Sequence, residues 1–189
     1  MSDRDAIEQS QARLLGRIAS RDKSALTDLY DQTSAVIYST AMRILGSAHD
    51  AEEMVQETFV QIWERASLFD PTLGSALSWA LRIARNRCID RMRAHRRRTR
   101  MIEDVSHEMQ AAIAEDREAR AGLSVEELSH VRSAVNGLPA DQRQAIKLAF
   151  FGGLTHQEIA EQLQEPLGTV KARIRRGMLK LRDALQPYL

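Results

Sequence analysis

Cysteine, proline and glycine are scarce in this chain of 189 residues, which contains one Cys, four Pro and nine Gly. The single cysteine, Cys88, excludes an intramolecular disulfide framework and a zinc site built from several cysteines. So few prolines and glycines disfavour an all-β chain, which needs many turns. No long stretch alternates between apolar and polar residues, so no sheet is expected.

Long apolar runs are missing as well. No stretch approaches 18 consecutive apolar residues, and the first ten residues, MSDRDAIEQS, lack the apolar run of a signal peptide. We therefore expect no membrane insertion and a cytoplasmic, reducing setting.

Charge of one sign is not in excess, because 27 Lys and Arg face 26 Asp and Glu, for a formal net charge of +1. The balance conceals four charged blocks. Residues 50–70 carry a net −5 and residues 103–127 a net −6, whereas residues 82–100 carry +8 and residues 171–182 carry +6. A basic run alone is most often a solvated surface, but two dense blocks on separate helices indicate nucleic-acid binding.

Helical spacing of apolar residues begins early in the chain. It predicts one long helix that ends before Gly46 and Ser47. Asp50 is expected to cap the next helix, with Glu53 at the third position of a capping box. That helix should continue to Trp63, with a wide apolar stripe along one side.

Further helices follow after a loop over residues 69–75, where Pro and Gly break the period. One is expected over about residues 76–95. Another begins near residue 123, after an Ala, Glu and Arg-rich segment with weak apolar periodicity that is typical of a linker. A helix over residues 140–151 should then end at the glycine pair 152–153.

The fold prediction is therefore all-α. Two small helical domains, residues 1–98 and 125–189, are expected to be joined by a flexible or partly helical linker over residues 99–124.

The C-terminal domain contains the pattern of a helix-turn-helix. A short helix over residues 154–163 has Thr155 as its N-cap and Glu158 three residues later. Residues 164–168 form a turn, and a second helix covers residues 169–185. In this motif the second helix lies in the major groove of DNA.

The second helix has two different sides at 100° per residue. Its predicted apolar seam consists of Val170, Ile174, Met178, Leu181 and Leu185. The opposite side carries Lys171, Ala172, Arg175 and Arg176, with Thr169 and Arg173 at its flank. Guanidinium and ammonium groups on one side suit phosphates and guanine edges, so DNA binding is favoured over a plain helical hairpin with a solvated basic side.

The helix near residue 80 has its own apolar seam, made of Leu77, Ala80, Leu81, Ala84, Cys88 and Met92. Cys88 is interpreted as a small core residue. Trp79 and Ile83 lie outside this seam. They are either packed under another helix or free to stack on bases of single-stranded nucleic acid, beside arginines that would follow the backbone.

Three segments resemble one family. Residues 50–63 are similar to the motif DAEDxVQExFxxxW, and residues 79–86 are similar to WLYRIARN, followed by DRMR at residues 90–93. Residues 138–173 are similar to LPxxQRxxxxLxxxxGLTxxEIAxxLxxPxGTVKxRxxR, with a departure at Gln164-Glu165, where a smaller or apolar residue often precedes the proline. The order and extent of these matches resemble bacterial RNA polymerase sigma factors of the extracytoplasmic-function (ECF) class.

The resemblance implies a function and a set of sites. It implies docking on core RNA polymerase through Asp50, Glu52, Glu53, Gln56, Glu57 and Gln61. It implies contacts to promoter DNA at the −10 element through Trp79, Arg82, Arg85, Asn86, Arg93 and Arg96, with Asn86 on a flipped base. It implies reading of the −35 element through Thr169, Lys171, Arg173, Arg175 and Arg176. A further implied partner is an anti-sigma factor that holds the two domains inactive, and neither a cofactor nor a metal is expected.

Two other function classes were weighed. A nuclease-like enzyme could hold a metal between Glu53 and Glu57, one helical turn apart, but neighbouring acids without a His partner usually form an interaction surface. No HExxH spacing or Gly-rich phosphate loop occurs; the five scattered histidines are His49, His95, His107, His130 and His156. A conventional repressor or response-regulator output domain is the second alternative, and dependence on polymerase distinguishes it from a sigma factor.

Overall fold

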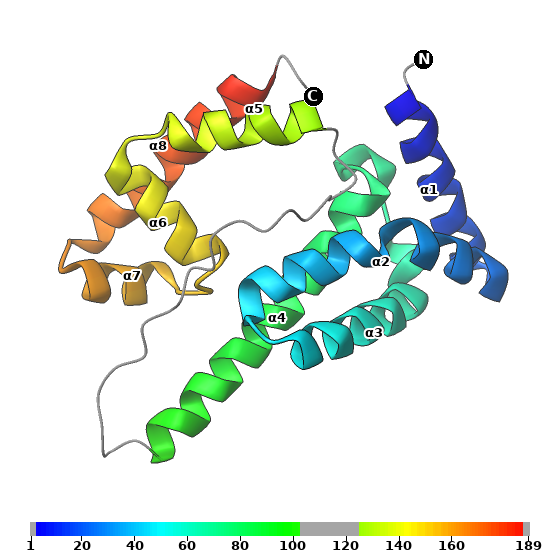
Figure 1. The fold of residues 1–189 in the computed structure, drawn as a ribbon, viewed down its shortest axis with the longest axis horizontal. Coiled ribbons are helices and arrows are strands. Elements are labelled where there is room, and N and C mark those ends of the chain that lie inside the picture. Colours follow the sequence, from blue (N-terminus) through cyan, green and yellow to red (C-terminus); the bar gives the residue numbers. More distant parts are fainter. Residues whose placement is uncertain (1–2, 103–124, 187–189) are drawn as a thin grey trace. The chain divides into compact units, whose positions relative to one another are not determined.

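The computed structural model describes residues 3–102 and 125–186, with the backbone alone for residues 3–4, 97–102 and 125–128. Every regular element in these ranges is a helix, which confirms the predicted all-α class (Figure 1). The chain divides into two compact units, Met1–Gly122 and Leu123–Leu189. Most of the predicted linker, with its acidic block, falls outside the described residues.

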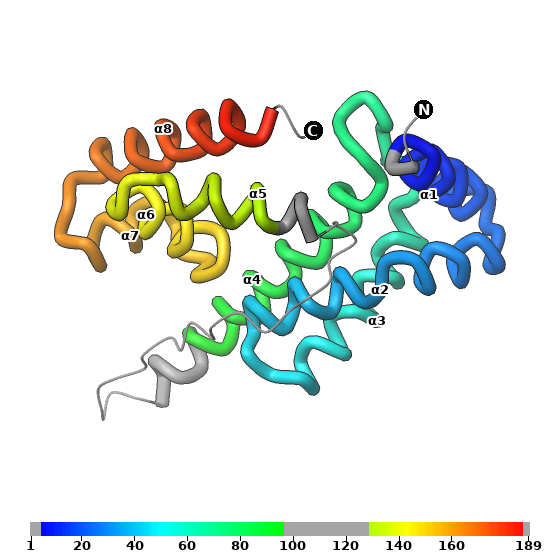
Figure 2. Tube along the Cα trace, turned by 45° about the horizontal axis from the view of Figure 1, so that its top comes forward, coloured from blue at the N-terminus to red at the C-terminus, as the bar shows by residue number. Residues whose placement is uncertain are grey.

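The described residues of the first unit form four long helices and two short 3-10 turns. Its elements are α1 (Asp3–Ala19), α2 (Lys23–Leu45), α3 (Ala48–Arg65), η1 (Ala66–Leu68), η2 (Pro71–Leu73) and α4 (Ala76–Ile102). α2 packs along both α3 and α4, and α1 packs across α2, as Figure 2 shows. α4 continues beyond the expected end near His95, through residues 99–102 of the predicted linker.

The core of the first unit is aliphatic, with Leu15, Ile37 and Ile62 almost completely buried. Two buried hydroxyls are satisfied within their own helices, because Thr33 donates to the Leu29 carbonyl and Thr58 donates to that of Met54. Small residues of α4 complete the core and allow α2 and α3 to approach it closely; they are Ala76, Ala80, Ala84 and Cys88.

The junction between α2 and α3 differs from the prediction in one detail. Gly46 ends α2 with φ of 70°, the left-handed conformation that glycine adopts without strain. The N-cap of α3 is Ser47, whose hydroxyl accepts a hydrogen bond from the Asp50 amide at 3.3 Å. The prediction of Asp50 as the cap was wrong by one helical turn, and the Asp50 carboxylate is therefore available for another partner.

The second unit contains α5 (Val125–Asn136), α6 (Ala140–Phe150), α7 (His156–Leu163) and α8 (Leu167–Leu185). Its small core forms around Ile159, Ala160 and Val170. The predicted capping box is confirmed, since Thr155 accepts from the Glu158 amide and Glu158 accepts from the Thr155 amide. The turn to α8 passes through Gln164 in the left-handed conformation, with φ of 53°.

The apolar seam of α8 was predicted incorrectly at one position. Met178 is 54% exposed, whereas its neighbour Gly177 is buried against α6. The seam therefore runs through Val170, Ile174 and Gly177, and the methionine lies on the surface. Glycine at this point lets the two helix backbones approach closely.

Candidate nucleic-acid interface

Three carboxylates of α3 converge on one arginine of α4. Arg91 Nη1 lies 3.0 Å from Asp50 Oδ1 and also bonds Glu53, while Arg91 Nη2 lies 3.1 Å from Glu57 Oε1. Arg87 adds a second contact to Glu57 at 2.9 Å. Hydrogen bonding to Glu53 is the main cause that raises the pKa of Arg91, so its charge is permanent. We call Asp50, Glu53 and Glu57 the acidic edge of α3.

The acidic edge contains half of the residues expected to dock on polymerase, and the structure places all three in internal ion pairs. The other predicted docking residues lie elsewhere on the helix. Glu52 and Gln56 are exposed, and Gln61 donates to Glu64 at 2.8 Å. At 100° per residue Val60 falls beside Gln56, and it is 55% exposed. We call Glu52, Gln56 and Val60 the outer face of α3.

Sequence reasoning missed Val60, although a signal was present. Its position along the helix separates it from the apolar stripe of Val55, Phe59 and Ile62. An exposed aliphatic residue between polar neighbours is common on protein surfaces, so this signal was weak.

The six predicted −10 residues of α4 fall on the side away from the acidic edge. Trp79, Arg82, Asn86 and Arg93 share one face, with Arg85 and Arg96 beside it, whereas Arg87 and Arg91 point about a third of a turn away toward α3. Arg82 and Asn86 are exposed. The arginines of α4 therefore divide into a set paired with α3, Arg87 and Arg91, and a set on another side of the helix.

Trp79 and Ile83 pack against the core of the first unit, which resolves the alternative left open by the sequence. The Trp79 ring meets Phe69 edge to face, with centroids 5.8 Å apart. Trp79 is only partly buried, and Asn86 lies about two helical turns further along the same face of α4.

Positive charge is concentrated where Arg85 and Arg93 approach each other. Burial is the main cause that lowers the pKa of Arg85, and the charge of Arg93 lowers it further. Arg85 remains protonated at neutral pH because arginine titrates far above it. Two positive charges close together at a partly buried position attract anions, such as the phosphates of nucleic acid.

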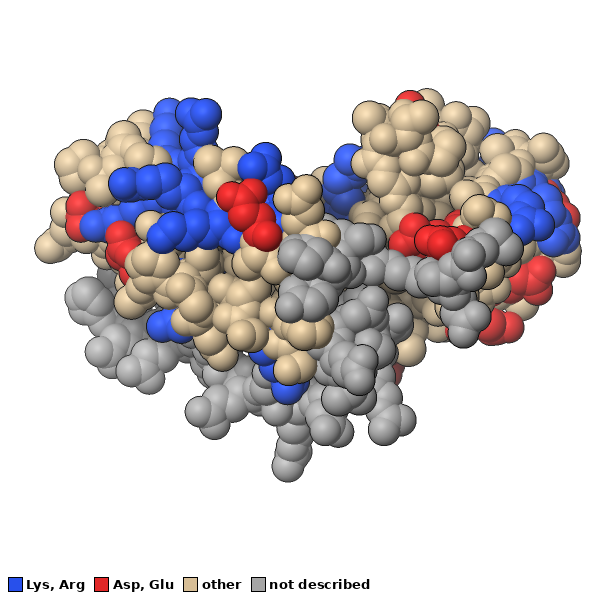
Figure 3. All heavy atoms as spheres, turned by 90° about the horizontal axis from the view of Figure 1, so that it is seen from above, with Lys and Arg blue, Asp and Glu red and all other residues tan. Residues whose placement is uncertain are grey.

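The predicted −35 residues of α8 do not form one group in the structure. Lys171, Arg175 and Arg176 are exposed on the side opposite Val170, and Thr169 is half-buried at its margin. Figure 3 shows Lys and Arg gathered over the part of the second unit that carries α8. Arg173 lies on the inner flank and forms ion pairs with Asp141 and Glu165, each at 3.0 Å.

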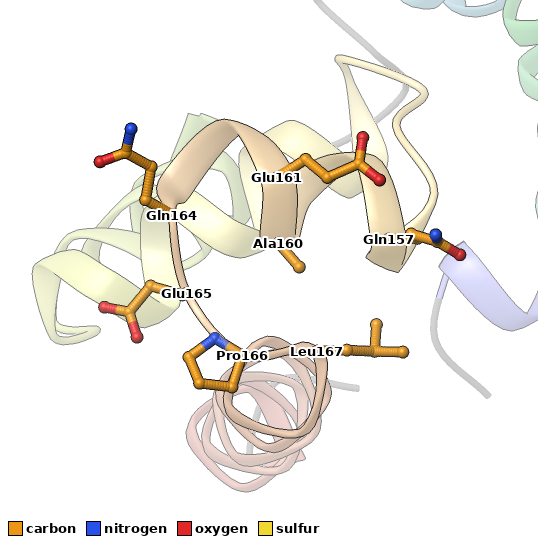
Figure 4. A pocket seen from close by; sticks show the side chains of 7 residues that line it. All are labelled: Gln157, Ala160, Glu161, Gln164, Glu165, Pro166 and Leu167. Carbon is orange, nitrogen blue, oxygen red and sulfur yellow. The ribbon is translucent and has the colours of Figure 1, made fainter.

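A shallow hollow of about 550 Å³ lies between α7 and the start of α8 (Figure 4). Its lining includes Gln157 and Glu161 from α7 and Leu167 from α8, with Glu165 and Pro166 from the turn. The lining includes two acidic residues and no Lys or Arg. The hollow therefore does not extend the basic surface of α8.

Across residues 3–102 and 125–186, no cluster of His, Cys, Asp and Glu has an arrangement that could hold a metal ion. Glu53 and Glu57, the candidates for such a site, are paired with arginines. No helix in the described part of the chain is long and apolar enough to cross a membrane.

Comparisons with known proteins match both units of the chain to one family. The family model described as sigma-70 region 2 matches residues 29–98, and the model described as sigma-70, region 4 matches residues 128–181. The ECF RNA polymerase sigma factor SigK of Mycobacterium bovis (strain BCG / Pasteur 1173P2) is 35% identical over 173 residues, covering 91% of each chain. SigK of Mycolicibacterium vanbaalenii is 35% identical over 176 residues, covering 91% of this chain and 87% of its own.

Solved structures with matching sequences include Rhodobacter sphaeroides SigE in complex with the anti-sigma ChrR. It is 29% identical, with 93% of this chain and 98% of that chain covered and a TM-score of 0.44. The sigma factor RpoE in complex with the anti-sigma factor NepR, from Bartonella quintana, is 25% identical, with coverage of 85% and 96% and a TM-score of 0.40.

Proposed function

The chain belongs to the ECF RNA polymerase sigma factors, and from this premise we propose how its two helical units divide the work. A sigma factor is a transcription initiation factor that binds core RNA polymerase and directs it to promoters. We assign polymerase docking and opening of the −10 element to residues 1–98, and reading of the −35 element to residues 125–189.

The observation that carries this assignment is the division of the basic side chains into two outward surfaces. On α8, Lys171, Arg175 and Arg176 are exposed on one side of the second helix of a helix-turn-helix. Arginine recognises guanine through two hydrogen bonds and lysine binds phosphates, so this surface is suited to a duplex element in the major groove.

The outward surface of α4 is suited to a different substrate. Asn86 is an exposed amide that can hydrogen-bond a base edge, and the fixed ring of Trp79 offers a stacking surface beside it. Arg82 and Arg93 lie on the same face and would contact the backbone. These groups together favour an unpaired strand, in which bases are turned away from their partners.

Polymerase docking is assigned to the outer face of α3, with the acidic edge as its border. Glu52 and Gln56 offer polar contacts and Val60 an apolar one, a mixture typical of protein interfaces. The acidic edge contributes negative potential even while Arg91 occupies it, since its three carboxylates exceed the two arginines in charge.

The remaining parts of the proposal concern setting and control. We assign the protein no catalytic activity of its own and place it in the cytoplasm, where its polymerase works. We also assign it an anti-sigma factor, because ECF-class sigma factors are typically held inactive by one. The repressor alternative has no observation of its own in the structure.

Transcription in vitro with core RNA polymerase tests the proposal. Promoters are selected from genomic fragments by core polymerase with the full-length protein, and transcripts are then measured from them. Replacing Arg175 and Arg176 by Ala should weaken promoter binding and reduce the slope of log affinity against log salt by about 1 to 2 units. Replacing Arg13, an exposed arginine of α1, serves as the control and should change neither.

Tight sequence-specific binding by the protein alone, unaffected by core polymerase, would contradict the proposal and restore the repressor interpretation.

A further inference from the structure

Arg173 occupies a different environment from the other basic residues of α8. Its side chain is 20% exposed, and its guanidinium is engaged on two edges. Nε lies 3.0 Å from Asp141 Oδ2, and Nη2 donates to Glu165 Oε1 at the same distance. Both contacts are ion pairs, and the contact to Glu165 is also a charge-assisted hydrogen bond.

The two carboxylates come from two different segments. Asp141 lies in the first turn of α6, where the helix dipole favours a negative charge. Glu165 lies in the turn of the helix-turn-helix, directly after the left-handed Gln164. One guanidinium therefore joins α8 to the start of α6 and to the turn that sets the angle between α7 and α8.

A phosphate contact by Arg173 would require these pairs to break. Two carboxylates would then remain without their cation. Lys171, Arg175 and Arg176 carry no such cost, because they already point outward from the opposite side of the helix. The two ion pairs of Arg173 are therefore more favourable than a phosphate contact that would break them.

We propose that Arg173 is a positioning residue of the DNA-reading helix, and that Asp141 and Glu165 act in promoter recognition through it. The inference rests on the proposed function of the second unit. It removes one arginine from the set that touches DNA and adds two acidic residues to the set on which recognition depends.

The proposal and its alternative predict opposite signs for the acidic variants. If Arg173 bound DNA, Asp141→Asn or Glu165→Gln would release it and remove a negative charge, so promoter affinity would rise. If Arg173 positions the helix, the same changes loosen α8 and lower promoter affinity by about tenfold, the equivalent of one charge-assisted hydrogen bond. Affinity for non-specific DNA should hardly change.

The experiment measures promoter affinity of the full-length protein with core polymerase as a function of salt. Asp141→Asn and Glu165→Gln are compared with Glu161→Gln, an exposed acid of α7 that should have little effect. Arg173→Met should lower affinity without changing the salt slope. Arg175→Met should lower both affinity and slope, by about 1 unit of slope.

Arg173→Lys separates the two roles if Arg173→Met fails to fold. A lysine keeps a phosphate contact, but it cannot bind two carboxylates through a planar fork. The positioning role predicts that Arg173→Lys behaves like Glu165→Gln, with the ratio of specific to non-specific affinity reduced. Higher affinity in Asp141→Asn, or wild-type affinity in Arg173→Lys with a reduced slope in Arg173→Met, would overturn the inference.

Failure of the proposed function would be recognised separately. In that case Arg175→Met would have no effect on promoter binding, and core polymerase would confer no sequence preference on the wild-type protein. If Arg175→Met lowers promoter affinity as expected but Asp141→Asn raises it, only the proposed role of Arg173 is rejected.

Discussion

α4 and α8 are both basic helices, and each holds some of its arginines against carboxylates of its own unit while presenting others outward. In α4 the internal arginines are Arg87 and Arg91, which face three acids of the single neighbouring helix α3. In α8 the internal arginine is Arg173, which joins two acids from separate segments. The first arrangement fixes a helix pair, whereas the second fixes a turn.

The difference shows that net charge along a segment does not measure the charge available to a partner. The −5 block of residues 50–70 and the +8 block of residues 82–100 partly neutralise each other across the α3–α4 contact. The outer face of α3 and the exposed Arg82 of α4 lie outside this contact. The two charged blocks are evident in the sequence, but the contact between them is not.

The largest effect in this comparison is expected from Arg91. Arg91→Met leaves the three acids of the acidic edge close together without their main cation, and should destabilise the first unit by about 2–3 kcal/mol. Denaturant unfolding followed by tryptophan fluorescence measures this, because both tryptophans, Trp63 and Trp79, lie in the first unit.

Arg82→Met, on the outward face of the same helix, is the matched control and should change stability by less than about 0.5 kcal/mol. Equal losses in the two variants would show that the ion pairs of α4 are too solvated to matter. It follows that charge reversal at Glu53 or Glu57 cannot test docking alone, because it also removes a partner of Arg91. Glu52→Lys is the cleaner docking variant.

Much of the fold was predictable because its signals are local. The period of apolar residues located α2 and α3, and Thr155 with Glu158 located the start of α7 through a capping box within one turn. Ser47 and Asp50 show the limit of such signals. Both are good cap residues three positions apart, and only the backbone conformation decides between them.

The candidate site was less predictable because its decisive contacts are not local. Glu57 and Arg91 are 34 residues apart in sequence, and Asp141 and Arg173 lie in different helices, α6 and α8. No periodicity connects such positions. The assignment of Arg173 to DNA followed from its place in a basic block, and the burial of one flank of α8 against α6 could not be read from that block.

A smaller effect is expected where α8 packs on α6. A Cβ at Gly177 would lie 2.6 Å from Ile146 Cδ1 and 3.3 Å from Gln142 Cβ, and the Gln142 Oε1 is buried there without a hydrogen-bond partner among the described residues. Gly177→Val should destabilise the second unit by about 1–2 kcal/mol through overpacking. Amide hydrogen exchange in α6 and α8 measures this separately from the first unit.

Gly16 in α1 is the matched glycine, because a Cβ there would meet nothing within 4 Å. Gly16→Ala should stabilise the first unit by up to about 1 kcal/mol through helix propensity. Gly177→Ala should increase stability less than Gly16→Ala does, because the Ile146 side chain has to move to make room for the new Cβ. A larger gain at Gly177 than at Gly16 would show that the α6–α8 contact is loose, unlike the alanine-lined contact of α4.

The smallest effect concerns Cys88, which lies with those alanines in the buried face of α4. Burial raises the pKa of its thiol from an ordinary value of 9.0 to about 11. The folded protein therefore keeps the thiol proton at a pH where the unfolded chain loses it. This contribution to stability is complete below pH 9 and is lost as the pH rises from 9 to 11.

Between pH 7 and pH 10 the free energy of unfolding should fall by about 1 kcal/mol more in the wild type than in Cys88→Ala, measured by tryptophan fluorescence. The difference between the two proteins removes the contribution of tyrosines and lysines that titrate in the same range. Identical pH dependence in the two proteins would mean that water reaches Cys88. The buried face of α4 would then exclude water no better than the α6–α8 contact, which buries the polar Gln142.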